Sequence, residues 1–86
     1  MQISNIVEEL KWFTREQLEA KIEYLRGYIL ELIKIAKESP QELRREYKRY
    51  IRTCSKILLI YLIELYKRTE DISILNKILS ILDVFL

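Results

Sequence analysis

The sequence predicts an all-α fold, a small antiparallel helical bundle made by a single domain over residues 1–86. Three observations support this prediction. Apolar residues recur at steps of three and four, as they do on one face of a helix. Glycine and proline occur once each, as Gly27 and Pro40, so few positions interrupt a helix. The sequence also lacks the apolar and polar alternation that is typical of a half-buried strand.

The first helix is expected over about residues 5–13. Asn5 and Glu8 have the spacing of a capping box, in which two side chains satisfy N–H groups that have no partner within the helix. This helix is expected to end near Phe13, because a second helix-start signal follows at once. It is therefore the shortest of the predicted helices.

The second helix is expected over residues 15–38. Thr14 and Gln17 form a second candidate capping box, with Phe13 and Leu18 at the two positions of a hydrophobic staple. One face carries a seam of apolar residues at alternating steps of four and three, namely Leu18, Ile22, Leu25, Ile29, Leu32 and Ala36. This seam is expected to pack against the next helix.

The third helix is expected over residues 40–68. Ser39, Pro40 and Glu42 place an N-cap, a first-turn proline and an acidic residue in order, which is the strongest start signal in the chain. Because the connection is so short, the second and third helices are expected to form an antiparallel hairpin. The face expected to be core comprises Leu43, Tyr47, Tyr50, Ile51, Cys54, Ile57, Leu58, Tyr61 and Leu65.

The fourth helix is expected over residues 71–85, with Thr69 or Asp71 as its N-cap. Apolar residues leave only a narrow polar stripe on this helix, so it needs cover on most sides. Part of its surface is expected to pack on the third helix. The surplus is expected to face a second subunit, through an apolar interface of Ile78, Leu79, Leu82, Phe85 and Leu86.

The third helix changes character along its length. Six basic residues of its first half lie within about 140° of its circumference, and they are Arg44, Arg45, Lys48, Arg49, Arg52 and Lys56. In the second half Leu59 and Ile63 occupy the same arc with Ile60 at its edge, and the fourth helix is expected to cover them. Residues 40–56 hold six basic and two acidic side chains, so the excess positive charge is concentrated there.

Three interpretations of the basic residues follow from the sequence. They form a solvated face, with Glu42 and Arg45, and Glu46 and Arg49, at pairing distance. Alternatively they contact a nucleic acid, although no known nucleic-acid motif accompanies them. The third interpretation is contact with an acidic protein surface.

Enzymatic chemistry is not expected. The chain has no histidine, the commonest proton shuttle and metal ligand, and the single Cys54 lies on an apolar face, where a free cysteine is usually a small buried hydrophobe. No metal, cofactor or small-molecule substrate is therefore predicted. With one cysteine, no secretory signal and no apolar run near the roughly 20 residues of a membrane span, a cytoplasmic protein without membrane contact is expected. The composition resembles a thermophile's.

The function predicted from the sequence is a non-enzymatic helical interaction module. It would be an accessory or assembly subunit in a homodimer or larger protein complex, with the basic residues turned to an anionic partner. The alternative is a nucleic-acid-binding protein, an accessory factor of DNA or RNA metabolism that uses the same residues. Tyr24, Tyr28 and Ile35 flank the seam of the second helix and are expected in the core, but if exposed they would form an aromatic patch for a protein partner.

Overall fold

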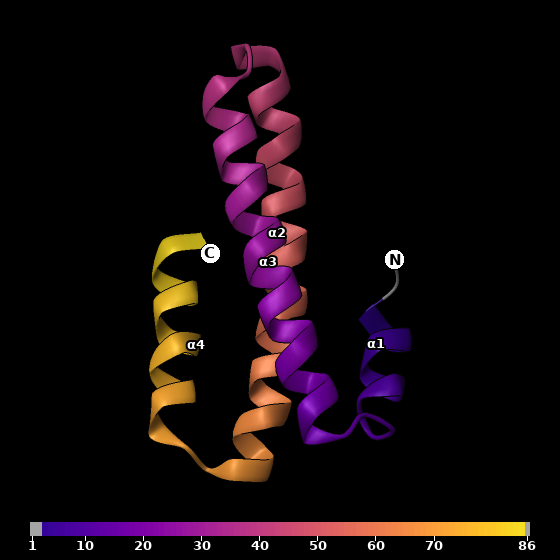
Figure 1. Cartoon of the computed structure of the whole chain (residues 1–86). Coiled ribbons are helices and arrows are strands. Elements are labelled where there is room, and N and C mark those ends of the chain that lie inside the picture. Colours follow the sequence, from indigo (N-terminus) through magenta and orange to yellow (C-terminus); the bar gives the residue numbers. More distant parts are fainter. Residues whose placement is uncertain (1–2, 86) are drawn as a thin grey trace.

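The computed structural model describes residues 3–85, with side chains over 5–83, and this part of the chain forms four α-helices and no strand. These helices are α1 (Ile3–Leu10), α2 (Arg15–Glu38), α3 (Gln41–Thr69) and α4 (Ile72–Phe85). In Figure 1, α2 and α3 form a long antiparallel hairpin, with α1 and α4 on opposite sides of its lower half. The predicted small all-α bundle is confirmed.

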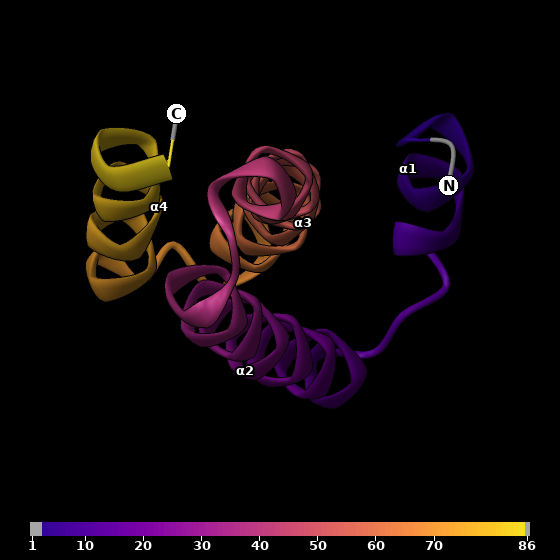
Figure 2. The same ribbon diagram turned by 90° about the horizontal axis from the view of Figure 1, so that it is seen from above.

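The longest helix, α3, is the centre of the bundle. It packs against α2, α4 and α1, whereas α2 and α4 make no close backbone contact with each other. Figure 2 looks along the hairpin and shows the other three helices on three sides of α3. The fourth side of α3 is open in that view.

The core lies where α1, α2 and α4 meet α3. From α2 it takes most of the predicted seam, since Leu18, Ile22, Ile29 and Leu32 are buried and Leu25 is half-buried. α3 contributes the largest share of buried apolar side chains, namely Ile51, Ile57, Leu58, Leu59, Tyr61, Leu62 and Leu65. The apolar periodicity of α2 therefore identified the buried face correctly.

The hairpin extends beyond the ends of α1 and α4 in Figure 1. We call residues 28–56 of this hairpin, which include its projecting part, the arm. Its buried apolar side chains are Ile29, Leu32 and Ile51. Two helices that pack along a single seam leave most of their surface to solvent, so the arm presents much more side-chain surface than the lower half of the bundle.

α1 differs from the prediction at both ends. It begins at Ile3, so Asn5 lies inside the helix and the predicted capping box with Glu8 is wrong. It ends at Leu10 rather than near Phe13, in a turn that leads to the extended residue Thr14. Arg68 of α3 donates hydrogen bonds to the carbonyl oxygens of Leu10 and Phe13 and so ties this turn to α3.

The predicted capping box at the start of α2 is confirmed. The backbone N–H of Gln17 donates to Thr14 Oγ1 over 3.1 Å, and the backbone N–H of Thr14 donates to Gln17 Oε1 over 2.8 Å. Two N–H groups at the helix start are thereby satisfied. The position of this box fixes where the chain turns between α1 and α2.

The connection between α2 and α3 closes in a different way from the prediction. Ser39 was expected to cap α3, but its hydroxyl donates to the carbonyl oxygen of Ile35 over 2.7 Å and so closes the end of α2. α3 begins after Pro40 without a side-chain cap. The predicted cap is wrong because Pro40, which has no side-chain hydrogen-bonding group, occupies the N-cap position of α3 in place of Ser39, while the predicted antiparallel hairpin is correct.

α4 starts after Asp71, one of its two predicted caps. Asp71 Oδ1 accepts hydrogen bonds from the backbone N–H and the hydroxyl of Ser73, each over 2.9 Å. These two bonds stabilise the carboxylate and lower the pKa of Asp71 below its ordinary value. The other predicted cap, Thr69, lies at the end of α3 and donates its hydroxyl proton to the carbonyl oxygen of Leu65.

Glu70 ends α3 in the left-handed backbone region, with a φ of 54°. A side chain with a Cβ is strained there, whereas glycine is not. We expect Glu70→Gly to raise the free energy of unfolding by about 0.5–1 kcal/mol. Urea denaturation followed by circular dichroism measures the change. Glu70→Ala is the control, because it removes the carboxylate and keeps the Cβ, and equal stabilities of the two variants would contradict the prediction.

Candidate functional site

The six basic residues predicted from the sequence are exposed along the α3 side of the arm, and we call them the basic stripe: Arg44, Arg45, Lys48, Arg49, Arg52 and Lys56. The surface beside the stripe is hollowed by about 500 Å³. This hollow is lined by five members of the stripe and by Gln41. The structure therefore brings these cations together on one surface, as the sequence predicted.

The stripe has no internal counter-ion. Among the described side chains three ion pairs form, and none includes a residue of the stripe. The predicted pairs Glu42–Arg45 and Glu46–Arg49 are not formed. Exposed pairs at this spacing are worth only about 0.2–0.5 kcal/mol, too little to hold two long side chains in one geometry. The positive charge of the arm is thus available to a partner.

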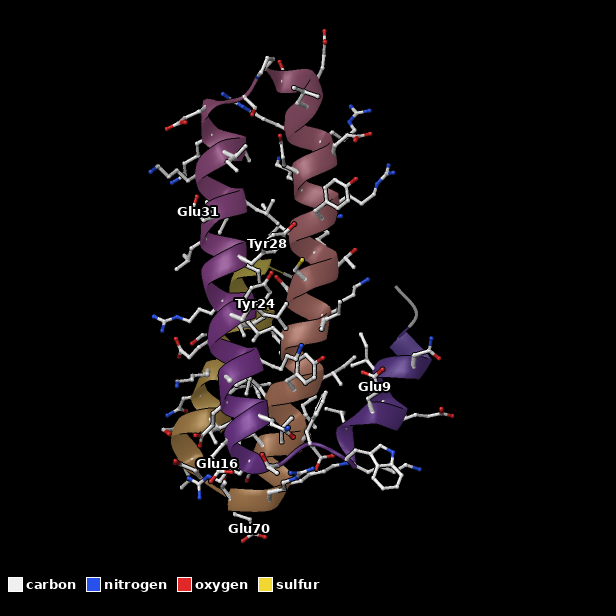
Figure 3. All side chains as sticks on the ribbon, turned by 45° about the vertical axis from the view of Figure 1, so that its right-hand side comes forward. Glu9, Glu16, Tyr24, Tyr28, Glu31 and Glu70 are labelled. Carbon is white, nitrogen blue, oxygen red and sulfur yellow. The ribbon has the colours of Figure 1, made fainter. Side chains whose placement is uncertain are left out.

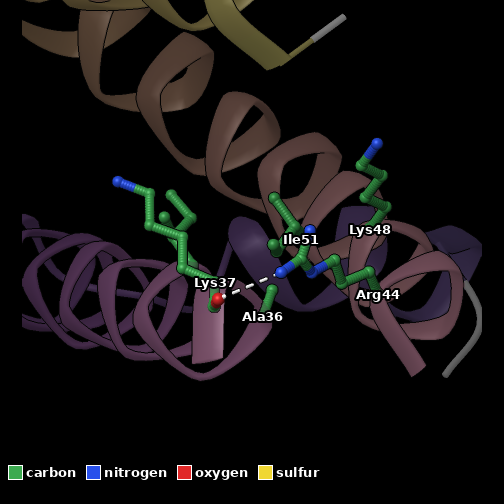
Figure 4. Close-up of a pocket in the computed structure, with 6 residues that line it drawn as sticks. Ala36, Lys37, Arg44, Lys48 and Ile51 are labelled. Atoms are coloured by element: carbon green, nitrogen blue, oxygen red, sulfur yellow. Dashed lines mark hydrogen bonds between the residues drawn. The ribbon is translucent and has the colours of Figure 1, made fainter. Parts of the chain in front are cut away.

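Arg44 differs from the other members of the stripe because it has a structural role. Its Nε donates to the carbonyl oxygen of Ser39 over 2.9 Å, and its Nη2 donates to that of Lys37 over 3.3 Å. Figure 4 shows the second of these bonds. The guanidinium group satisfies free carbonyls at the end of α2, where a cation also suits the helix dipole.

A hollow of about 350 Å³ lies between α2 and α3 on the arm. Its apolar lining comes from Ile33, Ala36 and Ile51. Its remaining lining residues are Lys37, Arg44 and Lys48, which are drawn with it in Figure 4. An apolar floor with cations around it suits a partner that offers an apolar group next to a carboxylate.

The arm also carries a group of exposed apolar side chains, which we call the aromatic face: Tyr24, Tyr28, Ile35, Leu43 and Tyr50. Tyr24 precedes the arm by one helical turn, and its ring stacks on that of Tyr28 with centroids 6.3 Å apart. Both tyrosines project from the same side of α2 in Figure 3. Helix geometry places the members from α3 on the same side of the hairpin.

The aromatic face corrects the sequence-based assignment of these residues to the core. Tyr50 is 56 % exposed and Leu43 is also exposed, although both belong to the predicted core face of α3. Tyr24, Tyr28 and Ile35 are exposed as well. The physical reason is that α1, the helix on this side, ends below the arm and leaves it uncovered (Figure 3).

The residues of the predicted apolar interface of α4 differ in exposure, and the interface itself stays a prediction. Ile78 is only 8 % exposed and belongs to the core, so its assignment to the interface is wrong. Leu79 and Leu82 are exposed, as an interface requires. The side chains of Phe85 and Leu86 lie outside the described residues. The difference arises because Ile74 and Ile78 form the row that α4 turns toward α3.

Ile63 of α3 is a second correction on this side of the molecule. It was expected beneath α4, but it is 43 % exposed, whereas Leu59 is buried and Ile60 is half-buried. α4 lies on the Leu59 and Leu62 side of α3 and does not reach the arc that contains Ile63. An apolar side chain therefore continues the line of the basic stripe at the surface.

Cys54 is half-buried on the arm, and burial raises the pKa of its thiol. The thiol form is thereby favoured over the nucleophilic thiolate. Among the described side chains there is no group of three histidine, cysteine, aspartate or glutamate residues that could hold a metal ion. Within the same part of the chain, no helix combines the length and the apolar character that a membrane crossing requires.

The described residues thus define a class of architecture: a small helical bundle with a projecting hairpin arm that bears a basic stripe and an aromatic face. Comparison of the chain with protein-family models, with curated proteins and with solved structures finds no match. The functional argument therefore rests on the surfaces themselves.

Proposed function

We propose that this chain is a non-enzymatic interaction module, an accessory or assembly subunit whose arm binds an acidic protein. One observation carries the proposal: the arm presents the basic stripe of α3 next to the aromatic face, which α2 and α3 form together. Arg49 of the basic stripe and Tyr50 of the aromatic face are adjacent in sequence, and their side chains point about 100° apart around α3. A partner that wraps around the first half of α3 can therefore contact both surfaces.

The aromatic face favours a protein over other anionic partners. Exposed tyrosines are the residues that most often anchor protein interfaces, because a large rigid ring buries much apolar area at a low cost in side-chain entropy. Burial of an exposed Tyr28 or Tyr50 against a partner would stabilise the complex. The partner would need an apolar surface bordered by carboxylates.

The basic stripe would mainly accelerate and orient docking. Unpaired cations attract an acidic partner over about 8–10 Å at physiological ionic strength, and they suppress binding of basic proteins. The apolar contacts would then determine how long the complex lasts. This division predicts an association rate that falls with salt.

Nucleic-acid binding is the second candidate function, and the spacing of the stripe favours it. Arg45, Arg49, Arg52 and Lys56 follow one row of α3 that is about 16 Å long at 1.5 Å per residue. None of them is held in an ion pair within the described residues. Such a row could follow a phosphate backbone.

Photo-crosslinking in cells tests the protein partner. A benzophenone side chain in place of Tyr28 is expected to give a defined protein adduct, and one in place of the exposed Trp12, far from the arm, is expected to give none. The triple variant Arg45→Glu, Arg49→Glu, Arg52→Glu should reduce the adduct by about tenfold or more, because like charges repel an acidic surface. An adduct that forms equally with the triple variant would contradict the proposal.

Fluorescence anisotropy with labelled single-stranded and double-stranded oligonucleotides separates the two candidates. At about 50 and about 200 mM salt, four phosphate contacts predict a log–log salt slope of about −3 to −4. Micromolar binding with this slope, lost in the triple variant, would establish the nucleic-acid function instead. We expect no such binding, while the adduct at Tyr28 remains.

A further inference from the structure

The open fourth side of α3 is lined by a surface that the described residues leave uncovered. Leu58 and Leu62 of α3 line a groove with α2, so the opposite side of α3, which contains Ile63, faces away from α2. In α4 the side chains of Asn76, Lys77 and Ser80 line the same groove. The open side is the upper one in Figure 2, where no helix lies.

The outer side of α4 also faces away from α2. Since Lys77 and Ser80 face the groove and Ile78 faces α3, helix geometry places Leu79 and Leu82 on the side away from α2. Leu79 is 53 % exposed, and Leu82 is also exposed. Together with Ile63 they form what we call the apolar ridge: Ile63, Leu79 and Leu82.

The charges that border the apolar ridge differ between the two helices. On α3 the open side carries Lys56 above Ile63 and Lys67 below it, and both are exposed. On α4 the bordering charge is acidic: Asp83 lies one helical turn after Leu79, at the upper end of the ridge. Asp71, at the lower end, is turned toward α2, where it lines a hollow with Arg15. The α3 side of this surface thus carries lysines and the upper part of its α4 side carries an aspartate.

We propose that a second copy of this chain covers the fourth side of α3. In the arrangement that the charges favour, a two-fold axis runs parallel to the helices, and α4 of each copy packs antiparallel on α3 of the other. The ridge leucines of one copy then lie against Ile63 of the other. The same surface serves on both copies, so the dimer closes and no third copy can add.

The heights of the charges agree with this arrangement. Lys56 lies about 20 Å above the lower end of α3, and Asp83 lies about 17 Å above the lower end of α4, at 1.5 Å per residue. An axis parallel to the helices preserves height, so Lys56 of one copy meets Asp83 of the other at the upper border.

This inference goes beyond the proposed function and does not depend on it. It concerns the lower half of the bundle and Lys56, the last residue of the basic stripe, whereas the partner is assigned to the rest of the arm. A dimer of this kind would direct both arms the same way, with two basic stripes available to one acidic partner. The triple variant of the arm leaves Lys56 unchanged, so it should lose the partner and keep the dimer.

Sedimentation analysis across about 1 to 100 micromolar protein tests the dimer. The wild type is expected to approach twice the chain mass of 10.5 kDa. The variant Leu79→Glu, Leu82→Glu should weaken dimerisation by at least about a hundredfold, because it places unpaired carboxylates in an apolar contact. Leu43→Glu, an equally exposed leucine on the aromatic face, should not weaken it. A monomeric wild type, or a dimer that survives the double variant, would overturn the proposal.

A charge-swap experiment tests the arrangement itself. Lys56→Asp and Asp83→Lys should each weaken dimerisation by about tenfold, because each creates two like-charge contacts per dimer. When the two variants are mixed, both contacts of the heterodimer become pairs of opposite charge. Mixing is therefore expected to restore dimers, which contact within one chain could not do. If mixing restores nothing, the proposed arrangement is wrong.

Discussion

Leu62→Ala is expected to lower the free energy of unfolding by about 2–5 kcal/mol. Leu62 is 2 % exposed and lies on α3 between the sides that face α2 and α4. α2 and α4 do not contact each other closely, so both depend on the side chains of α3 to hold them. Removal of this side chain leaves a cavity at the point where both helices are attached.

The expected loss is large for a chain of 86 residues. Domains of this size are stable by only about 5–15 kcal/mol, and each kcal/mol lost lowers the melting temperature by about 4–8 °C. We therefore expect the melting temperature of Leu62→Ala to fall by about 10 °C or more. Thermal and urea denaturation should be compared at one protein concentration, because dimerisation would raise the stability of both proteins.

Leu30→Ala is the matched control. It is the same chemical change on α2, but Leu30 is 57 % exposed. Its truncation therefore removes little buried apolar surface. Its effect on the free energy of unfolding is expected to stay within about 0.5 kcal/mol. If the two variants lost equal stability, Leu62 would not be the side chain that joins α2 and α4 to α3.

Local sequence signals predicted the helices well, and the reason is that these signals act over only a few residues. The steps of four and three that identified Leu18, Ile22, Ile29 and Leu32 describe one helix face regardless of the rest of the chain. The capping box at Thr14 likewise joins residues three apart. Periodicity and capping therefore gave the helix count and most helix ends.

Signals that depend on distant residues were missed. The sequence near Leu10 indicates only that α1 ends before the capping box at Thr14, whereas the hydrogen bond that holds the Leu10 carbonyl comes from Arg68, 58 residues away. Ser39 was expected at the N-cap of α3, but Pro40 occupies that position and the Ser39 hydroxyl donates to α2, which depends on the geometry of the hairpin. The role of Arg44 at the end of α2 depends on the same geometry.

The candidate site was predicted in part. Helix periodicity correctly grouped the basic stripe, because it states which residues share a side of α3. It cannot state which sides other helices cover, and for that reason Tyr50 and Ile63 were assigned to the core although both are exposed. The predicted helix lengths contained a usable signal: a hairpin much longer than the helices beside it must leave its far end uncovered.

The uncovered surfaces have different uses in the proposed function. The apolar ridge is self-complementary, because lysines on α3 border it on one side and Asp83 on α4 borders it on the other. The basic stripe has one sign of charge and cannot pair with a second copy of itself. Self-association through the lower half and capture of a partner through the arm are therefore compatible, and the separate variants above test each one alone.

Arg68→Ala is expected to release α1 from the bundle while the other helices stay folded. The guanidinium group donates to the carbonyl oxygens of Leu10 and Phe13, and its Nε lies 3.1 Å from Glu64 Oε2. α1 has eight residues, too few to be stable alone in water, and it packs only against α3 among the described helices. Loss of these charge-assisted bonds is expected to cost about 1–3 kcal/mol, since the pair is partly exposed.

Hydrogen exchange measures this release directly. In Arg68→Ala the α1 amides, which include those of the buried Ile6 and Leu10, should exchange about tenfold faster or more, while the α2 and α3 amides of the arm keep their protection. Arg68→Lys is the control, because an ammonium group keeps the charge but lacks the planar fork that reaches two carbonyls at once. We expect it to restore protection of α1 only in part. Unchanged exchange of α1 in Arg68→Ala would show that apolar packing of Ile6 and Leu10 holds this helix without the arginine.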